Sequence, residues 1–549
     1  MVQAPSLRRA ETMISAVFGE RAFPAVLSVS YAVSFFLFFF IPARFWDDLN
    51  ITNNPDFIGM TKKSGILLGG PVGQVLLSLH DPDLAMRLCA FAGFFVAALL
   101  LRRFLAILNL VTVGERNAIV LLTAALPLYQ SRFQVVLFYY SLAYLLFCGA
   151  AVLLAIGLLR RRPLYRIPAY ILFVAAFYIE SFLTLYFFLL LLLLLALPGR
   201  KDGPGAIRAF WIRSVDFVRR APEAVALPFI FFILKTWLTP ATGAFEGYNE
   251  VTARGVAGAL LRLPATVFDA LTSIPGDGPN WVILAAVAAL ALALLCLIRP
   301  SAVPPAEDDR PQRNTVALFV LLAGAALAVF PYIVVNHRVS PFDFDDRNQI
   351  TLLLVAGGLA VFTVRTLLRR RLQWPMLFAI LVWSVAHNAS TYAAIIRDGH
   401  TQNAVIHAMV QNPAVQRHTS FLVDTRQWPN LSRHRLLSTA QLNCLMKQAY
   451  GDESRFAAEF TGAPFDWHAE RVTLDRYKYV GTCFRDYRES MPFLLTVRMI
   501  RQPSYRNALT LTLLRLMAPE RYEQALDGYF SVSLTPLPSG WLQSGGSPP

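Results

Sequence analysis

Long apolar stretches separated by short polar segments dominate the chain up to about residue 396. They cover residues 23–41, 84–101, 117–129, 135–159, 168–197, 224–238, 281–298, 316–335, 349–368 and 375–395. Most are close to the roughly 20 residues that a helix needs to cross the hydrocarbon core of a bilayer. The pattern predicts an all-α, polytopic membrane domain over residues 1–396.

The stretch at residues 168–197 is longer than one crossing needs. Arginine-rich segments flank it on both sides, at residues 160–166 and 200–220. Because basic loops stay in the cytoplasm, a stretch between two of them crosses the membrane an even number of times. A helical hairpin with its tip at residues 178–181 satisfies this condition and brings the predicted number of transmembrane helices to about eleven.

Composition and charge agree with this topology. The 549 residues are 56% hydrophobic and 15% charged, whereas soluble globular proteins carry about 25% charged residues. This composition excludes an ordinary soluble enzyme and a disordered chain. Much of the net charge of +15 comes from arginines in predicted cytoplasmic loops, so it indicates no nucleic-acid partner. We predict a multi-pass protein of a bacterial plasma (inner) membrane with a cytoplasmic N-terminus. Lys62 and Lys63, in a predicted extracytoplasmic loop, are exceptions to the rule that basic loops stay in the cytoplasm.

Residues 397–549 differ from the rest of the chain, because helical and strand-like patterns of mixed polarity alternate there. They predict a C-terminal α+β domain on the extracytoplasmic side. Cys444 and Cys483 lie in this region, and an oxidising compartment favours a disulfide between them. Two free thiols are the alternative.

Two adjacent acids, Asp47 and Asp48, follow the first predicted helix, in an extracytoplasmic loop over residues 42–83. Adjacent carboxylates at a membrane surface repel each other and are poorly solvated, so Arg44, a cationic substrate group or a metal must offset the cost. One carboxylate can take the proton of an acceptor hydroxyl, while its neighbour orients it or helps to bind a divalent metal such as Mg²⁺ or Mn²⁺. The alternative is that Asp47 caps a short interfacial helix.

The position of this acid pair resembles that in the GT-C superfamily of membrane glycosyltransferases, in which a first helix precedes an acidic pair in a long extracytoplasmic loop. The segments Gly69–Gln74, which leads into the second helix, and Tyr178–Ser181, at the hairpin tip, extend the resemblance. It implies transfer of a sugar, with inversion, from a polyprenyl-phosphate donor to an extracytoplasmic glycan or lipid acceptor. Asp47 or Asp48 is then the general base, and Glu180 a second catalytic acid unless it is only a solvated tip.

A donor of this kind releases a phosphate, which needs cations. The extracytoplasmic loop at residues 336–347 contains His337, Arg338 and Arg347, and a guanidinium matches the geometry of a lipid phosphate. Salt bridges to the three aspartates of the same loop are the alternative role for the two arginines.

A further extracytoplasmic loop covers residues 239–280 and contains Tyr248 and Arg254. It includes an amphipathic stretch at residues 256–271, which we expect to be a helix on the membrane interface. Together with Arg44, these residues are candidates for an acceptor site or a lid.

Two other functions are consistent with the sequence. One is a transporter or flippase for a lipid-linked sugar, which is expected to place charges along a path through the bilayer. The other is a non-catalytic subunit of a cell-envelope assembly complex, which would tolerate loss of the acid pair. The sequence contains no Walker A, HExxH or GxSxG motif, so it does not support the usual nucleotide hydrolases, zinc proteases or serine hydrolases. It predicts neither the donor sugar nor the oligomeric state.

Overall fold

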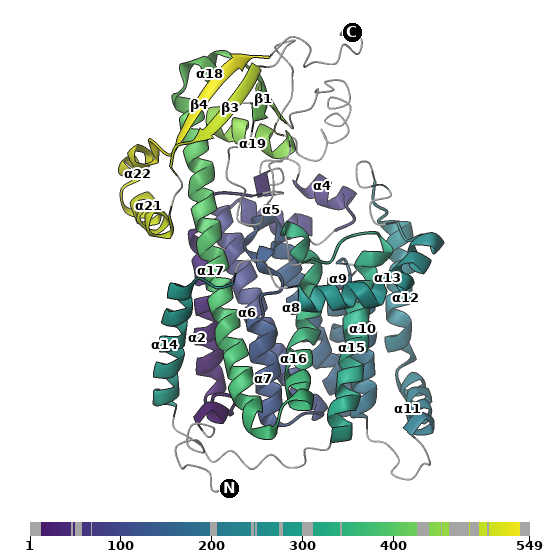
Figure 1. Cartoon of the computed structure of the whole chain (residues 1–549). Coiled ribbons are helices and arrows are strands. Elements are labelled where there is room, and N and C mark those ends of the chain that lie inside the picture. Colours follow the sequence, from purple (N-terminus) through teal and green to yellow (C-terminus); the bar gives the residue numbers. More distant parts are fainter. Residues whose placement is uncertain are drawn as a thin grey trace.

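A computed structural model shows a helical bundle with one small sheet near the C-terminus (Figure 1). The structure describes residues 13–45, 48–49, 57–66, 69–179, 181–197, 206–242, 246, 250–273, 278–298, 311–340, 343–424, 439–451, 453–460, 483, 493–501 and 504–537.

Each apolar stretch found in the sequence contains a helix. The helices are α2 (Phe23–Phe35) with the 3₁₀ turn η1 (Phe36–Phe40), α6 (Pro82–Leu108), α7 (Val113–Ala125), α8 (Phe138–Leu159), α9 (Arg166–Ala176), α10 (Ser181–Ala196), α12 (Pro222–Leu238), α14 (Trp281–Leu297), α15 (Pro311–Val334), α16 (Leu353–Leu367) and α17 (Arg370–Gln411). Most of them stand upright side by side in Figure 1. The predicted all-α, polytopic membrane architecture is confirmed.

The number of helices long enough to span a membrane differs from the predicted eleven. Among the described residues, seven helices are long and apolar enough, or eight if α12 and the preceding α11 (Ala206–Arg220), bent by 74°, count as one span. Several helices in predicted spans are short: α7, α9, α10 and α14 have 13, 11, 16 and 17 residues. The predicted number therefore includes helices below the usual spanning length.

Helix α13 (Ala253–Thr272) contains the amphipathic stretch expected at the interface. It is long and apolar enough to span a membrane, yet only 11% of its apolar window is buried. In Figure 1 it lies across α15 rather than along it. Its Arg262 donates a hydrogen bond of 3.1 Å to Asn336, just beyond the end of α15. This arrangement suits a helix that lies on the membrane surface.

The stretch at residues 168–197 folds into the predicted pair of helices. Helix α9 packs on α8, and α10 packs on α15. The chain leaves the helical path after Ala176 and resumes it at Ser181. The tip residue Glu180 lies outside the described residues.

Short α7 lies in the interior of the bundle, where every residue from Asn117 to Ala125 is buried. Thr112 and Glu115 form a capping box at its start. Its 13 residues are about 20 Å long, so it ends inside the bundle and the chain turns there. Gly357 of α16 permits close packing, because a Cβ at this position would lie 2.3 Å from the Ile119 carbonyl oxygen.

The C-terminal domain is built on a four-stranded sheet, in the order β2 (Phe456–Glu459), β1 (Ser420–Asp424), β3 (Phe493–Met499) and β4 (Phe530–Pro536). Strand β1 runs parallel to β2 and β3, and β4 is antiparallel to β3. Helix α19 (Thr439–Tyr450) packs on β2. The predicted α+β class of this domain is confirmed.

Helix α17 joins the bundle to the sheet. It has 42 residues and is about 63 Å long, twice the roughly 30 Å of a hydrocarbon core. The domain boundary predicted after residue 396 falls inside this helix, which continues to Gln411. The sheet lies at its upper end in Figure 1, and we call this end of the bundle the sheet end.

The predicted disulfide between Cys444 and Cys483 is present in the structure. It closes a loop of 39 residues, so its loss is expected to lower the free energy of unfolding by about 2–4 kcal/mol. A reductant should lower the melting temperature of the wild type and leave that of Cys444→Ala/Cys483→Ala unchanged. Alkylation of Cys444 and Cys483 in the unreduced protein, detected by mass spectrometry, would contradict the pairing.

Candidate active site at the sheet end

The segment that follows the first helix is fixed at the sheet end by two other helices. Buried Arg87 of α6 donates a hydrogen bond of 3.0 Å to the Ile41 carbonyl oxygen. Gln402 of α17 donates one of 3.0 Å to the Arg44 carbonyl oxygen. Helices far apart in the sequence therefore position the start of the loop that contains the acid pair.

Arg44, predicted to belong to an acceptor site or a lid, forms an ion pair with Asp83. Its Nε and Nη2 atoms donate to the two carboxylate oxygens, both at 3.0 Å. The side chains of Arg44 and Asp83 are 31% and 25% exposed, so the pair adds little to stability. Its main effect is geometric, because a bidentate pair fixes the loop predicted at residues 42–83, which we call the first loop, to α6.

Asp48 is buried, with 1% of its surface exposed. Its Oδ2 accepts the Val135 N–H at 3.0 Å, and its Oδ1 accepts the Val136 N–H at 2.7 Å. These amides belong to the 3₁₀ turn η3 (Val135–Leu137), which leads into α8, so Asp48 caps the start of that helical segment. With both oxygens engaged and almost no exposed surface, Asp48 fixes the backbone at the start of η3.

Burial raises the pKa of Asp48 from 3.8 to about 7, against the opposing effect of the two amide hydrogen bonds. The folded state therefore holds this proton more tightly than the unfolded state. The resulting stability is present below about pH 4 and is lost as the pH rises to about 7. We expect the melting temperature of the wild type to fall over this interval relative to that of Asp48→Asn. A constant difference between the two proteins across a pH series would contradict the assignment.

Asp346 holds the other end of the same backbone segment. It is 1% exposed, and its Oδ2 accepts the Gln130 N–H at 2.7 Å and the Ser131 N–H at 3.1 Å. These amides open the 3₁₀ turn η2 (Gln130–Phe133), whereas Asp346 belongs to η6 (Asp343–Leu352). Two aspartates from distant parts of the chain therefore fix residues 130–137, of which residues 135–137 belong to the apolar stretch predicted at 135–159.

Arg132 lies within this fixed segment and is 3% exposed. Its guanidinium lies over the rings of Phe35 and Phe94, with its Cζ 4.1 and 4.8 Å from the ring centroids. Its Nε donates a hydrogen bond of 2.9 Å to the Tyr129 carbonyl oxygen. Aromatic faces stabilise a buried cation. Arg132 is therefore enclosed by the protein rather than presented to a ligand.

The loop after α15 contains the three side chains predicted to bind phosphate. Arg338 is exposed, and Asn348 donates a hydrogen bond of 2.7 Å to its carbonyl oxygen. Burial, followed by the nearby charge of Arg347, lowers the pKa of His337. His337 is therefore neutral at pH 7 and can donate one hydrogen bond to an anion.

The helix that starts at the hairpin tip approaches this loop. Helix α10 contacts η6, and Tyr332 of α15 lies near both Ser181 and Arg347. The Tyr332 and Ser181 hydroxyls, which are close enough to interact with each other, and the side-chain amide of Gln349 are buried and form no hydrogen bond of normal geometry among the described residues. Buried polar groups are almost always paired, so water or a polar ligand group is expected here.

An apolar cavity of about 270 Å³ lies deeper in the bundle. Side chains of α6, α7, α8, α10, α15 and α16 line it, including Phe104, Phe188 and Phe362. On α6 the lining begins at Leu101, about 27 Å along the helix from Asp83. A hydrocarbon chain suits this cavity, and a polar head group does not.

The C-terminal domain reaches the first loop. The Sγ atom of Cys483 lies 3.7 Å from the carbonyl oxygen of Leu49, the residue after Asp48. The disulfide-linked part of the domain therefore contacts the segment that contains the acid pair.

Three predicted site residues, Asp47, Glu180 and Tyr248, lie outside the described residues. Arg254 lies in the first turn of α13 and is exposed. In the part of the chain that the structure describes, no group of three or more His, Cys, Asp or Glu side chains is arranged to hold a metal. A role for Mg²⁺ or Mn²⁺ stays a prediction.

No protein-family model matches this chain, and no curated protein matches it. Among solved structures, it is similar to the oligosaccharyltransferase of Archaeoglobus fulgidus, crystallised with an acceptor peptide tethered through a disulfide bond. The similarity covers 95% of this chain and 75% of that chain, with 10% sequence identity and a TM-score of 0.30. Similarity at this level carries no argument about the activity of the present chain.

Proposed function

We propose that this protein is a membrane glycosyltransferase that moves a sugar from a polyprenyl-phosphate donor to a glycan or lipid acceptor at the sheet end. The observation that carries the proposal is the gathering of carboxylates, arginines and buried hydroxyls at one end of an apolar bundle that also contains an apolar cavity. An amphiphilic donor needs both environments, a polar one for its head and an apolar one for its chain. The resemblance of the first loop to the GT-C superfamily supports the same activity.

Asp47 is the proposed general base. Its neighbour Asp48 is buried and bonded to two backbone amides, which leaves Asp47 as the acid of the pair assigned to the acceptor. Asp47 removes the proton of the acceptor hydroxyl, and the hydroxyl oxygen attacks the anomeric carbon of the donor sugar. The bond from that carbon to the phosphate oxygen breaks, polyprenyl phosphate leaves with the electron pair, and the configuration inverts.

The leaving phosphate is assigned to Arg338 and Arg347, with His337 as a neutral hydrogen-bond donor. Glu180 is proposed as a second acid that binds a hydroxyl of the donor or acceptor. A divalent cation fits Asp48 poorly, because both of its oxygens already accept amide hydrogens. The proposed reaction therefore assigns no step to a metal.

The acceptor is proposed to enter between the first loop and the C-terminal domain. The contact of Cys483 with Leu49 brings that domain beside the acid pair. Helix α13, which contains Arg254 and follows Tyr248 in the sequence, is proposed as a lid over the donor.

The proposed orientation puts the N-terminus in the cytoplasm and the sheet end outside a bacterial plasma membrane. The arginine-rich helix α11 lies at the opposite end of the bundle from the sheet (Figure 1). The Cys444–Cys483 disulfide supports an oxidising compartment at the sheet end.

A flippase for the same lipid is the competing function, and one experiment separates the two. The protein is reconstituted into vesicles that contain a radiolabelled polyprenyl-phosphate sugar, and acceptor glycans are added on the side of the sheet end. A transferase moves the label from the lipid to the acceptor. Movement of the intact labelled lipid between leaflets, with no loss of sugar from it, would contradict the proposal.

A further inference from the structure

A pair of helices, α21 (Tyr505–Met517) and α22 (Pro519–Leu526), lies beside the bundle and the sheet (Figure 1). The outer side of α21 is apolar. Five large side chains there are 41% to 82% exposed, and we call them the α21 stripe: Tyr505, Leu509, Leu513, Leu516 and Met517. At 100° per residue they occupy one arc of about 120°. On a helix at a water-exposed protein surface, an apolar arc of this kind normally packs against the protein interior.

The inner side of the pair makes polar contacts with α17. The two ring nitrogens of His400 lie 2.9 Å from the Thr512 hydroxyl and 3.1 Å from the Tyr522 hydroxyl. His407 and Asp527 form a further contact of 2.8 Å. The inner side also buries Leu511 and Leu526. The pair is therefore held to the protein by apolar and polar contacts together, and α21 carries a second apolar arc that faces outward, which is the arrangement expected of a surface that faces lipid.

Helix α17 places this pair at the level of the lipid head groups. From Arg370 to His400 the helix rises about 45 Å, which matches the roughly 40–45 Å of a bilayer with its head groups. Arg515 of α21 is near enough to Arg87 of α6 for their charges to interact. Leu88, the residue after Arg87 on α6, is apolar and 50% exposed. The α21 stripe therefore continues the lipid-facing surface of the bundle.

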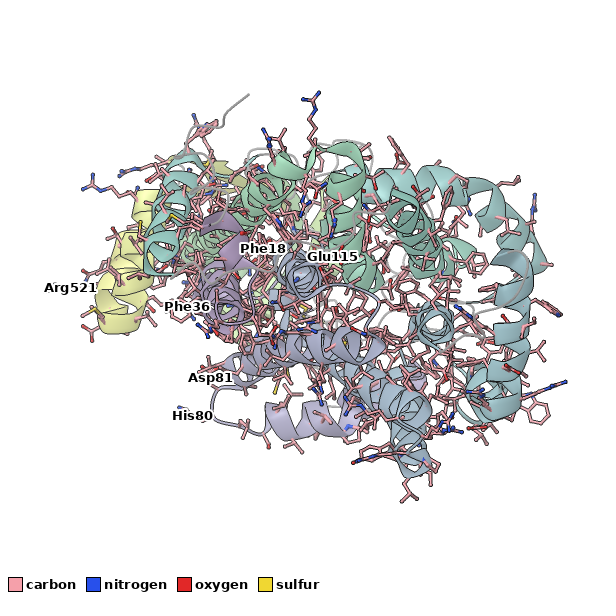
Figure 2. The ribbon with its side chains drawn as sticks, turned by 90° about the horizontal axis from the view of Figure 1, so that it is seen from below. Phe18, Phe36, His80, Asp81, Glu115 and Arg521 are labelled. Carbon is pink, nitrogen blue, oxygen red and sulfur yellow. A yellow bond between two sulfur atoms is a disulfide. The ribbon has the colours of Figure 1, made fainter. Side chains whose placement is uncertain are left out.

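Both signs of charge lie on or next to the pair. Four arginines are exposed, Arg501, Arg506, Arg515 and Arg521, and so are three acids, Glu520, Glu523 and Asp527. At 100° per residue, Arg506 lies on the same side of α21 as the stripe, whereas Arg515 lies on the side that faces α6 and α17. Figure 2, seen from below, shows Arg521 at the outer rim of the molecule. Guanidinium groups beside an apolar arc match the phosphates and acyl chains of a bilayer surface.

We propose that α21 lies in the membrane leaflet at the sheet end and anchors the C-terminal domain to it. The α21 stripe enters the acyl-chain boundary, and Arg506, on the same side of the helix, binds a lipid phosphate. This gives the domain a second attachment besides α17, and holds it where Cys483 contacts the first loop. The proposal does not depend on the chemistry of the site.

Lipid-borne quenchers test this placement in the full-length protein. Leu513→Cys is labelled with an environment-sensitive dye in a Cys89→Ala/Cys296→Ala background, in nanodiscs of phosphatidylcholine and phosphatidylglycerol. Glu523→Cys, on the exposed polar side of α22, is the matched control. Because the stripe enters the leaflet, quenching by spin-labelled lipid should be at least about three times as strong for the dye at residue 513 as for the dye at residue 523. Aqueous iodide should show the opposite order.

Three results would overturn the proposal. The first is equal quenching by iodide at both positions, which means that the stripe faces water. The second is quenching at residue 513 that depends on the number of protein copies per nanodisc, which means that a second copy covers it. The third is a dye at residue 513 shielded from both quenchers, which means that protein covers the stripe. Melting temperatures of both cysteine variants confirm that they are folded.

Discussion

Asp47→Asn is expected to lower the rate of sugar transfer by about 10²–10⁴-fold, the contribution of a general base. Asparagine has nearly the same size but cannot accept the proton of the acceptor hydroxyl. The effect should appear in kcat, because no role in donor binding is assigned to Asp47. The measurement is steady-state transfer of labelled sugar by the purified protein, with the melting temperature recorded for each variant.

Two further variants make this prediction specific. Asp48→Asn alters a buried cap, so its main effect is on stability and its pH dependence. Asp216→Asn removes a carboxylate from α11, at the end of the bundle opposite the sheet, and should leave kcat unchanged. Wild-type kcat in Asp47→Asn, or an equal loss in Asp216→Asn, would exclude Asp47 as the base.

Arg365→Met is expected to destabilise the bundle by about 3–5 kcal/mol, the usual cost of leaving one member of a buried ion pair without its partner. Arg365 of α16 pairs with Glu115 of α7, and the two side chains are 6% and 0% exposed. Figure 2 shows Glu115 within the bundle, viewed from the end opposite the sheet. Without the arginine, the Glu115 carboxylate loses its opposite charge in an apolar interior. Thermal unfolding in detergent measures the loss.

The double variant Glu115→Gln/Arg365→Met is the matched control. It removes both charges at once, so it should recover most of the lost stability. A double variant as unstable as Arg365→Met, or an Arg365→Met protein that melts like the wild type, would show that the charges are not coupled as the structure indicates.

The bundle itself could be predicted from the sequence, because a membrane span must be an apolar helix of limited length. Basic segments on both sides of residues 168–197 were enough to predict the hairpin of α9 and α10. The number of spanning helices was less predictable, because hydropathy identifies apolar residues but does not show where the helix within an apolar stretch begins or ends. Helix α7 illustrates this, because its apolar stretch continues to residue 129 whereas the helix ends at Ala125.

The buried contacts of Asp48 could not be predicted. Asp47 and Asp48 are equivalent in the sequence, and only the tertiary structure shows that Asp48 accepts the amides of Val135 and Val136. Those contacts join segments far apart in the chain, and periodicity contains no information about such pairs. The same holds for Asp346 and its contacts with η2.

The arginines show a similar limit. The sequence offered Arg44 as a counter-charge for Asp47 and Asp48, whereas its bidentate partner in the structure is Asp83. The positive-inside rule concerns clusters in loops, so it gave no reason to single out Arg132. Arg132 lies among aromatic rings that come from α2 and α6. The α21 stripe, by contrast, has a sequence signal in the spacing of Tyr505, Leu509 and Leu513, which a helical-periodicity analysis of the C-terminal region could have found.

The most direct test of the proposed activity follows one donor to its products. Purified wild-type protein is incubated with an isotopically labelled polyprenyl-phosphate sugar and an acceptor glycan, and the anomeric configuration of the product is read by NMR. We expect one polyprenyl phosphate to be released for each glycosidic bond formed, with the configuration opposite to that of the donor. A donor that stays intact with every sugar and acceptor tried, or a product that retains the donor configuration, would contradict the account.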